Sequence, residues 1–203
     1  MGVGLSVIDR AAAWAGVLLD DNQRNKLAVF GAWLIGEASA AGGLGPGEMT
    51  IMESRHLADS LLFAHGWWST NPESILDVGS GVGLPAVPLA IASPRTRVIA
   101  LDRSSRRARL IRRAGRLLDL PNLAVLERDV AEMKRDRFPV VVSRAALPPA
   151  RLRPHLQRLL LPGGIAVVGG SHVTKSVEEG YETLTVPAEV LDRPVWILIM
   201  AKP

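Results

Sequence analysis

An acidic residue followed by closely spaced glycines is the first feature of the sequence that could carry chemistry. Residues 74–85 read SILDVGSGVGLP, an apolar run that ends in an acidic residue and then breaks into glycines. The residues in question are Asp77, Gly79, Gly81 and Gly83. Glycines permit a tight reversal and let the backbone approach a ligand closely. We predict a strand, a loop and a helix here, with a nucleotide-like ligand lying across the loop.

Two classes of ligand use such a loop. The glycine spacing also fits the dinucleotide pattern G-x-G-x-x-G/A, with Asp102 as the ribose partner. A pyrophosphate, however, needs free N–H groups and the positive end of a helix, whereas Asp77 adds negative charge and Pro85 removes one donor. S-adenosylmethionine has no phosphate and carries an ammonium and a sulfonium that a carboxylate attracts. The residues favour the methyl donor; a nicotinamide dehydrogenase, or a loop that only turns the chain, is the alternative.

Composition limits the remaining possibilities. The chain has 203 residues, of which 48% are hydrophobic, so one sizeable core is expected. It has no cysteine, which excludes disulfides and thiolate metal sites, and we expect no metal. No apolar run approaches the roughly 18 residues that span a bilayer, so we predict a cytoplasmic monomer without membrane contact. The net charge of +4 indicates an anionic partner.

Hydrophobic periodicity predicts the elements that must position these residues. Three amphipathic helices are expected first, at about 5–19, 23–34 and 53–65, with a flexible glycine-rich loop at 38–47. Strands follow at 75–78, 98–101, 123–126, 140–142, 165–168, 183–186 and 195–200, with helices at 85–92, 104–118 and 148–161. We place a helical extension at 1–72 and a single compact domain at 73–203.

Strands that alternate with helices indicate a parallel, doubly wound α/β sheet whose strands are covered on both faces. The last two strands have no helix between them, so they are expected to form an antiparallel edge pair. This is the layout of class I S-adenosylmethionine-dependent methyltransferases, a Rossmann-like sheet of seven strands with one strand reversed. Ligands bind at the carboxyl ends of the strands in such sheets. Asp102 is then placed to accept from both ribose hydroxyls and Asp129 to meet the adenine amino group, with helix N-capping as the alternative for each.

The expected helix after Asp102 carries four arginines on one face. Arg106, Arg109, Arg113 and Arg116 fall at i, i+3, i+7 and i+10, with no acidic residue among them to relieve their mutual repulsion. Arginine forks match phosphate oxygens, so we predict that this stripe contacts RNA; a solvated helix face is the alternative. On the third helix, His56 and Asp59 share a face, which we interpret as a surface or capping contact.

Three motifs follow one another along the chain: Arg-His-Leu-Ala-Asp-Ser-Leu at 55–61, the strand-end run Asp-Val-Gly-Ser-Gly-Val-Gly-Leu-Pro, and Ser-Arg-Ala at 143–145. Together they resemble the motifs of the glucose-inhibited division protein B family. The resemblance covers about residues 15–201. It implies a bacterial enzyme that uses S-adenosylmethionine to methylate N7 of a guanosine in 16S rRNA of the small ribosomal subunit. It also implies that Gly79, Leu84, the Asp129–Val130 pair and Arg144 bind the cofactor.

Two family motifs are absent. The W-N…N-L-T motif is replaced by ASAAGGLGPG at 38–47, and the fifth expected strand runs into two glycines, at 169 and 170, without the usual Lys-Gly. Two alternatives therefore stay open: a methyltransferase for a small molecule, and a catalytically silent RNA-binding relative.

Methylation of guanine N7 needs no general base because this nitrogen already carries a lone pair. Alignment of the nucleophile with the methyl–sulfur bond, at roughly 3–3.5 Å, is the main task. We assign Arg144 and His56 as the catalytic residues that meet the N7 edge of the base.

Overall fold

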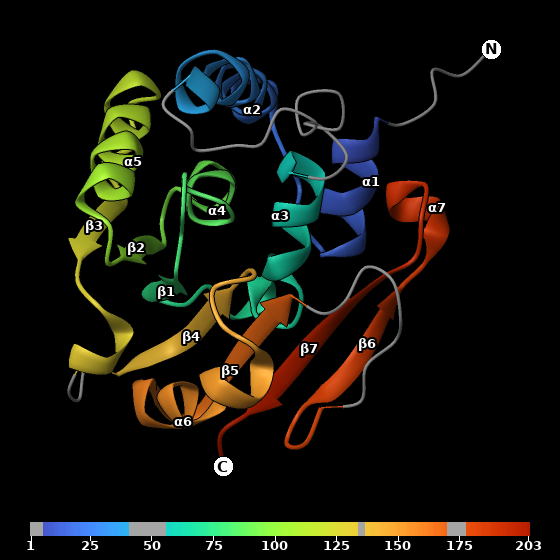
Figure 1. The fold of residues 1–203 in the computed structure, drawn as a ribbon. Helices are drawn as coiled ribbons and strands as arrows, with labels where there is room; N and C mark the ends of the chain where they lie inside the picture. Colours follow the sequence, from blue (N-terminus) through green and yellow to red (C-terminus); the bar gives the residue numbers. More distant parts are fainter. Residues whose placement is uncertain (1–5, 41–55, 134–136, 170–177) are drawn as a thin grey trace.

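A seven-stranded sheet runs through the molecule in the order β3-β2-β1-β4-β5-β7-β6 (Figure 1). The computed structural model describes residues 6–40, 56–133, 137–169 and 178–203. The strands are β1 (Ser74–Val78), β2 (Arg97–Asp102), β3 (Leu123–Glu127), β4 (Phe138–Ser143), β5 (Leu160–Gly169), β6 (Glu182–Val186) and β7 (Val195–Ala201). All seven lie where the sequence predicted them.

The pairing of the strands confirms the predicted fold class. Strands β1 to β5 pair in parallel, whereas β7 runs antiparallel to both β5 and β6. A single-turn helix, α7 (Ala188–Leu191), lies between β6 and β7, where no helix was expected. It is too short to return the chain for a parallel pairing. The central strand β1 lies between β2 and β4, so the connections leave it in opposite directions, which is where open α/β sheets bind ligands.

Helices cover both faces of the sheet. Figure 1 shows α1 (Val7–Trp14), α2 (Asp21–Trp33), α3 (Asp59–Leu61), α4 (Ala86–Ala92) and α5 (Ser105–Leu117) on one face and α6 (Pro149–Leu159) on the other. Side chains that alternate along β1 divide between the two cores: Ile75 packs under α1 to α5, whereas Leu76 and Val78 pack against α6. This double covering explains why the strands read as continuous apolar runs.

The helical extension shares the core of the sheet. Ala11, Leu27 and Phe30 belong to the same buried cluster as Ile75 and Val98. Asp20 caps α2: its side chain accepts from the Gln23 N–H while the Gln23 side chain accepts from the Asp20 N–H, as expected for a capping box. The boundary between the extension and the domain at residue 73 stays a prediction.

Three predicted helices differ from the structure in their ends or form. The first ends at Trp14 instead of residue 19, because Gly16 adopts a left-handed conformation (φ +81°) and Val17 N–H donates to Ala12 O, which closes a Schellman motif. The second continues through a π-helical turn, η1 (Leu34–Ala38). Ala38, expected to begin a flexible loop, is therefore helical and buried, while 41–47 lie outside the described residues.

The third helix is broken into short pieces. Residues 56–58 are π-helical, α3 follows with one turn, and η4 (Leu62–Ala64) is a 3₁₀ turn. Its predicted start, 53–55, falls outside the described residues. Just beyond it, Trp67 is buried and donates from Nε1 to Phe63 O at 2.6 Å, and Trp68 in the 3₁₀ turn η5 (Trp68–Thr70) packs against the core. Both tryptophans therefore contribute to the apolar core.

Candidate functional site

The glycine loop after β1 is fastened to the end of β2. The N–H groups of Gly79 and Ser80 both donate to Leu101 O, at 2.8 and 3.0 Å, and the N–H of Gly81 donates to the Asp102 carboxylate at 2.9 Å. Gly79, Gly81 and Gly83 all have positive φ, of 75°, 59° and 101°. The loop therefore requires the backbone freedom that the sequence pattern predicted.

Asp77 lies beneath the loop, fully buried. One carboxylate oxygen accepts from the N–H of Ala86 at the start of α4, at 3.1 Å, and the other has no hydrogen-bond partner among the described residues. Burial raises the pKa of Asp77 to about 7, against the opposing effects of the Ser80 hydroxyl, the Ala86 N–H and the charge of Arg144. Asp77 thus joins the loop to α4, and it does not line either cavity described below.

The first cavity, of about 230 Å³, opens at the carboxyl ends of β1, β2 and β3. Four of the predicted cofactor residues line it: Gly79, Asp102, Asp129 and Val130. Of the other predicted cofactor residues, Gly81, Gly83 and Leu84 lie in the loop beside it, and neither Asp77 nor Arg144 belongs to its lining. Two lining arginines were not predicted: Arg103 and Arg107. Arg103 directly follows β2, and this position at a strand end is the signal that could have found it.

The two acidic residues of this cavity also hold its framework. Asp102 is 4% exposed, and its oxygens accept from the N–H groups of Gly81 and Ser104, each at 2.9 Å. Asp129 caps the 3₁₀ turn η6 (Val130–Glu132) by accepting from the Ala131 N–H at 2.9 Å. N-capping, the alternative to ligand binding, is thus present at Asp129, and both carboxylates still face the cavity.

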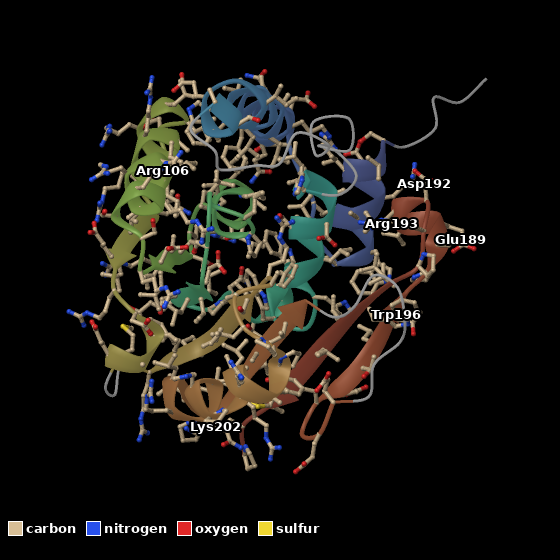
Figure 2. All side chains as sticks on the ribbon, viewed as in Figure 1. Arg106, Glu189, Asp192, Arg193, Trp196 and Lys202 are labelled. Carbon is tan, nitrogen blue, oxygen red and sulfur yellow. The ribbon has the colours of Figure 1, made fainter. Side chains whose placement is uncertain are left out.

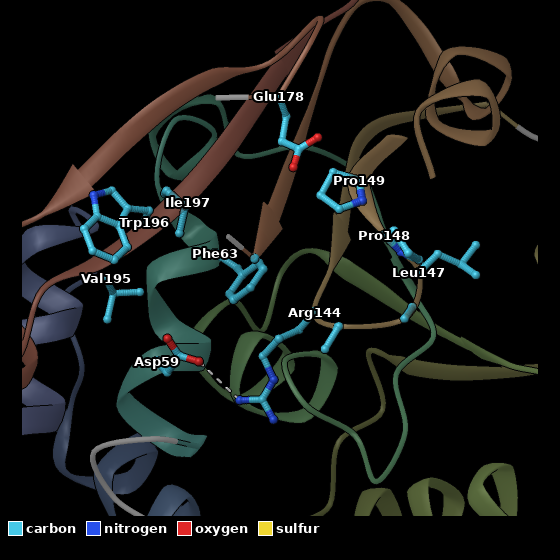
Figure 3. Close-up of a pocket in the computed structure, with 13 residues that line it drawn as sticks. Asp59, Phe63, Arg144, Leu147, Pro148, Pro149, Glu178, Val195, Trp196 and Ile197 are labelled. Carbon is cyan, nitrogen blue, oxygen red and sulfur yellow. Dashed lines mark hydrogen bonds and ion pairs between the residues drawn. The ribbon is translucent and has the colours of Figure 1, made fainter. Parts of the chain in front are cut away.

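A second, larger cavity of about 510 Å³ lies between α3, the β4–α6 connection and the ends of β5 and β7 (Figure 3). Arg144 lines it, together with Asp59 and Phe63 from the α3 and η4 turns. Ala145, Ala146 and Leu147 line both cavities and form the wall that they share. A Cβ on Gly79 would lie 2.3 Å from the Cβ of Ala146, so the glycine allows this wall to approach the loop.

Arg144 is held between two side chains of the broken third helix. Its Nη1 lies 3.4 Å from Oδ2 of Asp59, a contact that Figure 3 marks, and its Nη2 lies 3.3 Å from Nδ1 of His56. His56 and Asp59 are only 4% and 3% exposed, so the surface or capping contact predicted for them is wrong. The neighbouring residues Leu57 and Leu61 are buried in the core. Their apolar character was the sequence signal that this side of the helix is buried.

The predicted arginine stripe lies on the outer face of α5, where Figure 2 labels Arg106. All four of its arginines are exposed. No acidic residue lies within the stripe, but Glu37 of η1 pairs with Arg113 at 2.7 Å and relieves part of the repulsion from outside it. The stripe lines neither cavity; within α5 only Arg107 does, near the N-terminus of the helix.

Across 6–40, 56–133, 137–169 and 178–203, no three His, Asp or Glu side chains lie together in a way that could hold a metal ion. Within the same ranges, no helix combines the length and apolar character that crossing a bilayer requires.

Sequence comparisons place the chain beside methyltransferases of ribosomal RNA. A family model described as "rRNA small subunit methyltransferase G" matches residues 23–193. A protein of Chlorobium luteolum named ribosomal RNA small subunit methyltransferase G is 32% identical over 195 residues, which cover 93% of this chain and 82% of that protein. A protein of the same name from Acidothermus cellulolyticus is 32% identical over 169 residues, covering 77% and 75%.

Solved structures with a similar fold are much more distant in sequence. A mutant of MtNAS superposes with a TM-score of 0.60 at 14% identity, covering 97% of this chain and 82% of that chain. TrmN from Thermus thermophilus gives a TM-score of 0.53 at 17% identity, covering 71% and 49%. At these identities the likeness shows the fold alone.

Proposed function

Because the chain belongs to the rRNA small subunit methyltransferase G family, we propose that it transfers a methyl group from S-adenosylmethionine to N7 of a guanosine in 16S rRNA. One observation carries the proposal beyond family membership. Two cavities adjoin at the switch point of the sheet, and Ala145, Ala146 and Leu147 line both of them. A donor in the smaller cavity and a base in the larger one would therefore meet at this wall.

The residues of the smaller cavity fit S-adenosylmethionine. Asp102 faces the cavity with a carboxylate that two backbone N–H groups orient, which suits a ribose diol. Gly79 presents bare backbone at the wall, where a side chain would collide with Ala146. Beneath the loop, the buried carboxylate of Asp77 accepts from the N–H of Ala86 and so fixes the loop that borders this cavity.

The chain's own residues have an alignment task and no proton to remove. S-adenosylmethionine supplies an electrophilic methyl group, so that the C–S bond breaks as the bond to N7 forms and the positive charge passes from sulfur to the purine. Arg144 lines the base side of the shared wall, with its guanidinium oriented by Asp59 and His56. In this position it can donate to O6, the acceptor next to N7. His56 acts through Arg144 as a positioning residue, a narrower role than the catalytic one assigned from the sequence.

Exposed arginines supply the contact with RNA. Arg106, Arg109 and Arg116 are exposed along α5, and Arg128 adds a cation at the mouth of the smaller cavity. Salt-sensitive contacts of this kind position a nucleic acid without reading its sequence. We propose the small ribosomal subunit as the partner, with the protein acting as a cytoplasmic monomer.

Transfer of a radiolabelled methyl group from S-adenosylmethionine to purified 30S subunits tests the proposal, with the labelled base mapped by N7-specific strand cleavage. We expect label at one guanosine, and we expect Arg144→Ala to abolish most of it. Arg151→Ala is the matched control, because Arg151 is an exposed arginine of α6 that lines neither cavity.

Titration calorimetry of the cofactor separates the competing outcomes. Cofactor binding without any labelled RNA would replace the proposal with a small-molecule methyltransferase or a silent relative. Absence of cofactor binding would refute the interpretation of the glycine loop itself. If Arg144→Ala left both cofactor affinity and methyl transfer unchanged, the role given to Arg144 would be wrong.

A further inference from the structure

The larger cavity contains an acidic side chain for which methyl transfer has no use. Glu178 lines this cavity together with Arg144. Figure 3 shows the two side chains at opposite ends, with the carboxylate of Glu178 directed inward and the ring of Phe63 between them. An acceptor group thus faces whatever occupies the cavity, from the side away from the wall shared with the cofactor cavity.

The other walls suit a flat aromatic ring. Phe63 and Trp196 provide aromatic surface, and Pro148 and Pro149 provide apolar surface opposite (Figure 3). Gly169 also lines the cavity, beside Phe63 and Arg144, where a Cβ would be in ordinary contact at 3.4 Å and 3.6 Å. The volume of about 510 Å³ is within the range of about 300–1,000 Å³ that small ligands occupy. Bases splayed out of single-stranded RNA are held in this way, by stacking and by contacts to their edges.

The carboxylate of Glu178 indicates which base the cavity accepts. An ionised carboxylate only accepts hydrogen bonds, and guanine presents two adjacent donors, N1–H and the N2 amino group, on its Watson–Crick edge. Adenine presents an acceptor at N1, which a carboxylate repels. With guanine N1 and N2 turned to Glu178, the Hoogsteen edge of the purine, which carries N7 and O6, faces Arg144 and the shared wall. In this orientation the N1–H and N2 donors pair with Glu178, and the nucleophile N7 is directed to the cofactor.

We propose that Glu178 reads the Watson–Crick edge of the target guanine and sets the base specificity of the enzyme. This inference rests on the proposed function, since it names the group that selects the base for that reaction. It assigns the larger cavity as the base pocket, with Arg144 at the N7 side and Glu178 at the N1 side.

Glu178→Gln tests the inference with almost no change in shape. A glutamine amide has one acceptor and one donor, which no longer matches the two donors of guanine but does match N1 and the N6 amino group of adenine. We expect methyl transfer to guanosine to fall about 10- to 100-fold, since charge-assisted bidentate pairs are the strong ones and buried donors are left unpaired. We also expect the ratio of the guanosine rate to the adenosine rate to fall at least about 10-fold.

Glu179→Gln is the matched control. It removes the same charge from the neighbouring residue, whose carboxylate is 92% exposed and pairs with Arg153 at 3.2 Å, and Glu179 does not line the cavity. We expect this variant to retain the parent rates and the parent ratio. Calorimetric titration of S-adenosylmethionine should give the same affinity for the parent and both variants.

The rates are measured in single turnovers on 30S subunits reconstituted with transcribed 16S rRNA, with guanosine or adenosine at the position that the parent protein labels. A slower reaction at an unchanged guanosine-to-adenosine ratio would overturn the inference, because Glu178 would then help without reading the base. Parent-like behaviour of Glu178→Gln, or an equal loss in Glu179→Gln, would overturn it as well. Failure of the parent protein to label any subunit would instead refute the proposed function.

Discussion

Adding one methyl group to the glycine loop should separate two roles that glycine plays there. Gly79 and Gly81 both have positive φ, of 75° and 59°, so an alanine at either position is strained in the same way. A Cβ on Gly81 would meet nothing within 4 Å, whereas a Cβ on Gly79 would lie 2.3 Å from Cβ of Ala146. The two substitutions differ only in whether they displace the wall between the cavities.

The size of each effect follows from these contacts. An alanine in left-handed backbone costs about 1–2 kcal/mol, so both variants should lose about this much stability. At position 79 the added carbon must also reach an ordinary separation of about 3.5–4.0 Å, so Ala146 or the loop must shift by more than about 1 Å. Overpacking of this kind costs about 1–3 kcal/mol more. An additional cost of this size corresponds to an increase in the cofactor Kd of about 5- to 150-fold.

Titration calorimetry with S-adenosylmethionine and thermal unfolding of the same samples measure both consequences. We expect Gly81→Ala to lower the melting temperature modestly and to leave the cofactor Kd within about threefold, because the strain alone does not move the cavity wall. We expect Gly79→Ala to raise the Kd by about one to two orders of magnitude. Equal Kd values for the two variants would show that the contact with Ala146 does not shape the cofactor site, and the reasoning would fail.

Three further substitutions test other parts of the site. Asp59→Asn removes the charge that orients Arg144 at 3.4 Å, so single-turnover methyl transfer should fall about 10-fold or more while the cofactor Kd stays unchanged; a parent-like rate would contradict the positioning role. Burial raises the pKa of Asp77 to about 7, so this carboxyl's contribution to stability is complete below its unfolded pKa of about 3.9 and is lost as the pH rises through about 7. In urea unfolding, the stability of Asp77→Asn relative to the parent should therefore rise between about pH 4 and pH 7.5. A difference in stability that did not change with pH would refute this. Arg109→Ala should reduce the magnitude of the slope of log affinity for 30S subunits against log salt by about one. Arg113→Ala should reduce it less, because Glu37 already balances the charge of Arg113. Equal slopes for the two variants would count against a role of the stripe in RNA binding.

Local sequence signals were sufficient for the sheet and for one half of the site. The strands could be predicted because both faces of the sheet are covered, which leaves each strand as an uninterrupted apolar run. Asp102 follows such a run directly and Asp129 follows another within three residues, so their place at one edge of the sheet required only that the strands be parallel. Both residues line the smaller cavity.

Contacts between distant segments could not be predicted in this way. Arg144 and Asp59 are 85 residues apart in the sequence, and nothing in either segment indicates which residue of the other it meets. The same holds for Arg113 and Glu37, whose pairing removed part of the repulsion expected within the arginine stripe. Glu178 follows no strand end, so only the folded chain brings it into the cavity with Arg144.

Backbone strain supports the assignment of the shared wall as the functional centre. Ala145 has φ +55°, a conformation that costs a residue with a Cβ about 1–2 kcal/mol and that persists only where its surroundings enforce it. The surroundings do so here on both sides: Ser143 donates from Oγ to Val78 O at 2.9 Å, which ties the end of β4 to β1, and Ala146 lies against the bare backbone of Gly79. The strained residue thus directly follows Arg144, between the loop proposed to hold the methyl donor and the pocket proposed to hold the base. A wall under this constraint keeps the two reactants at a fixed separation, which is what a reaction that depends on alignment requires.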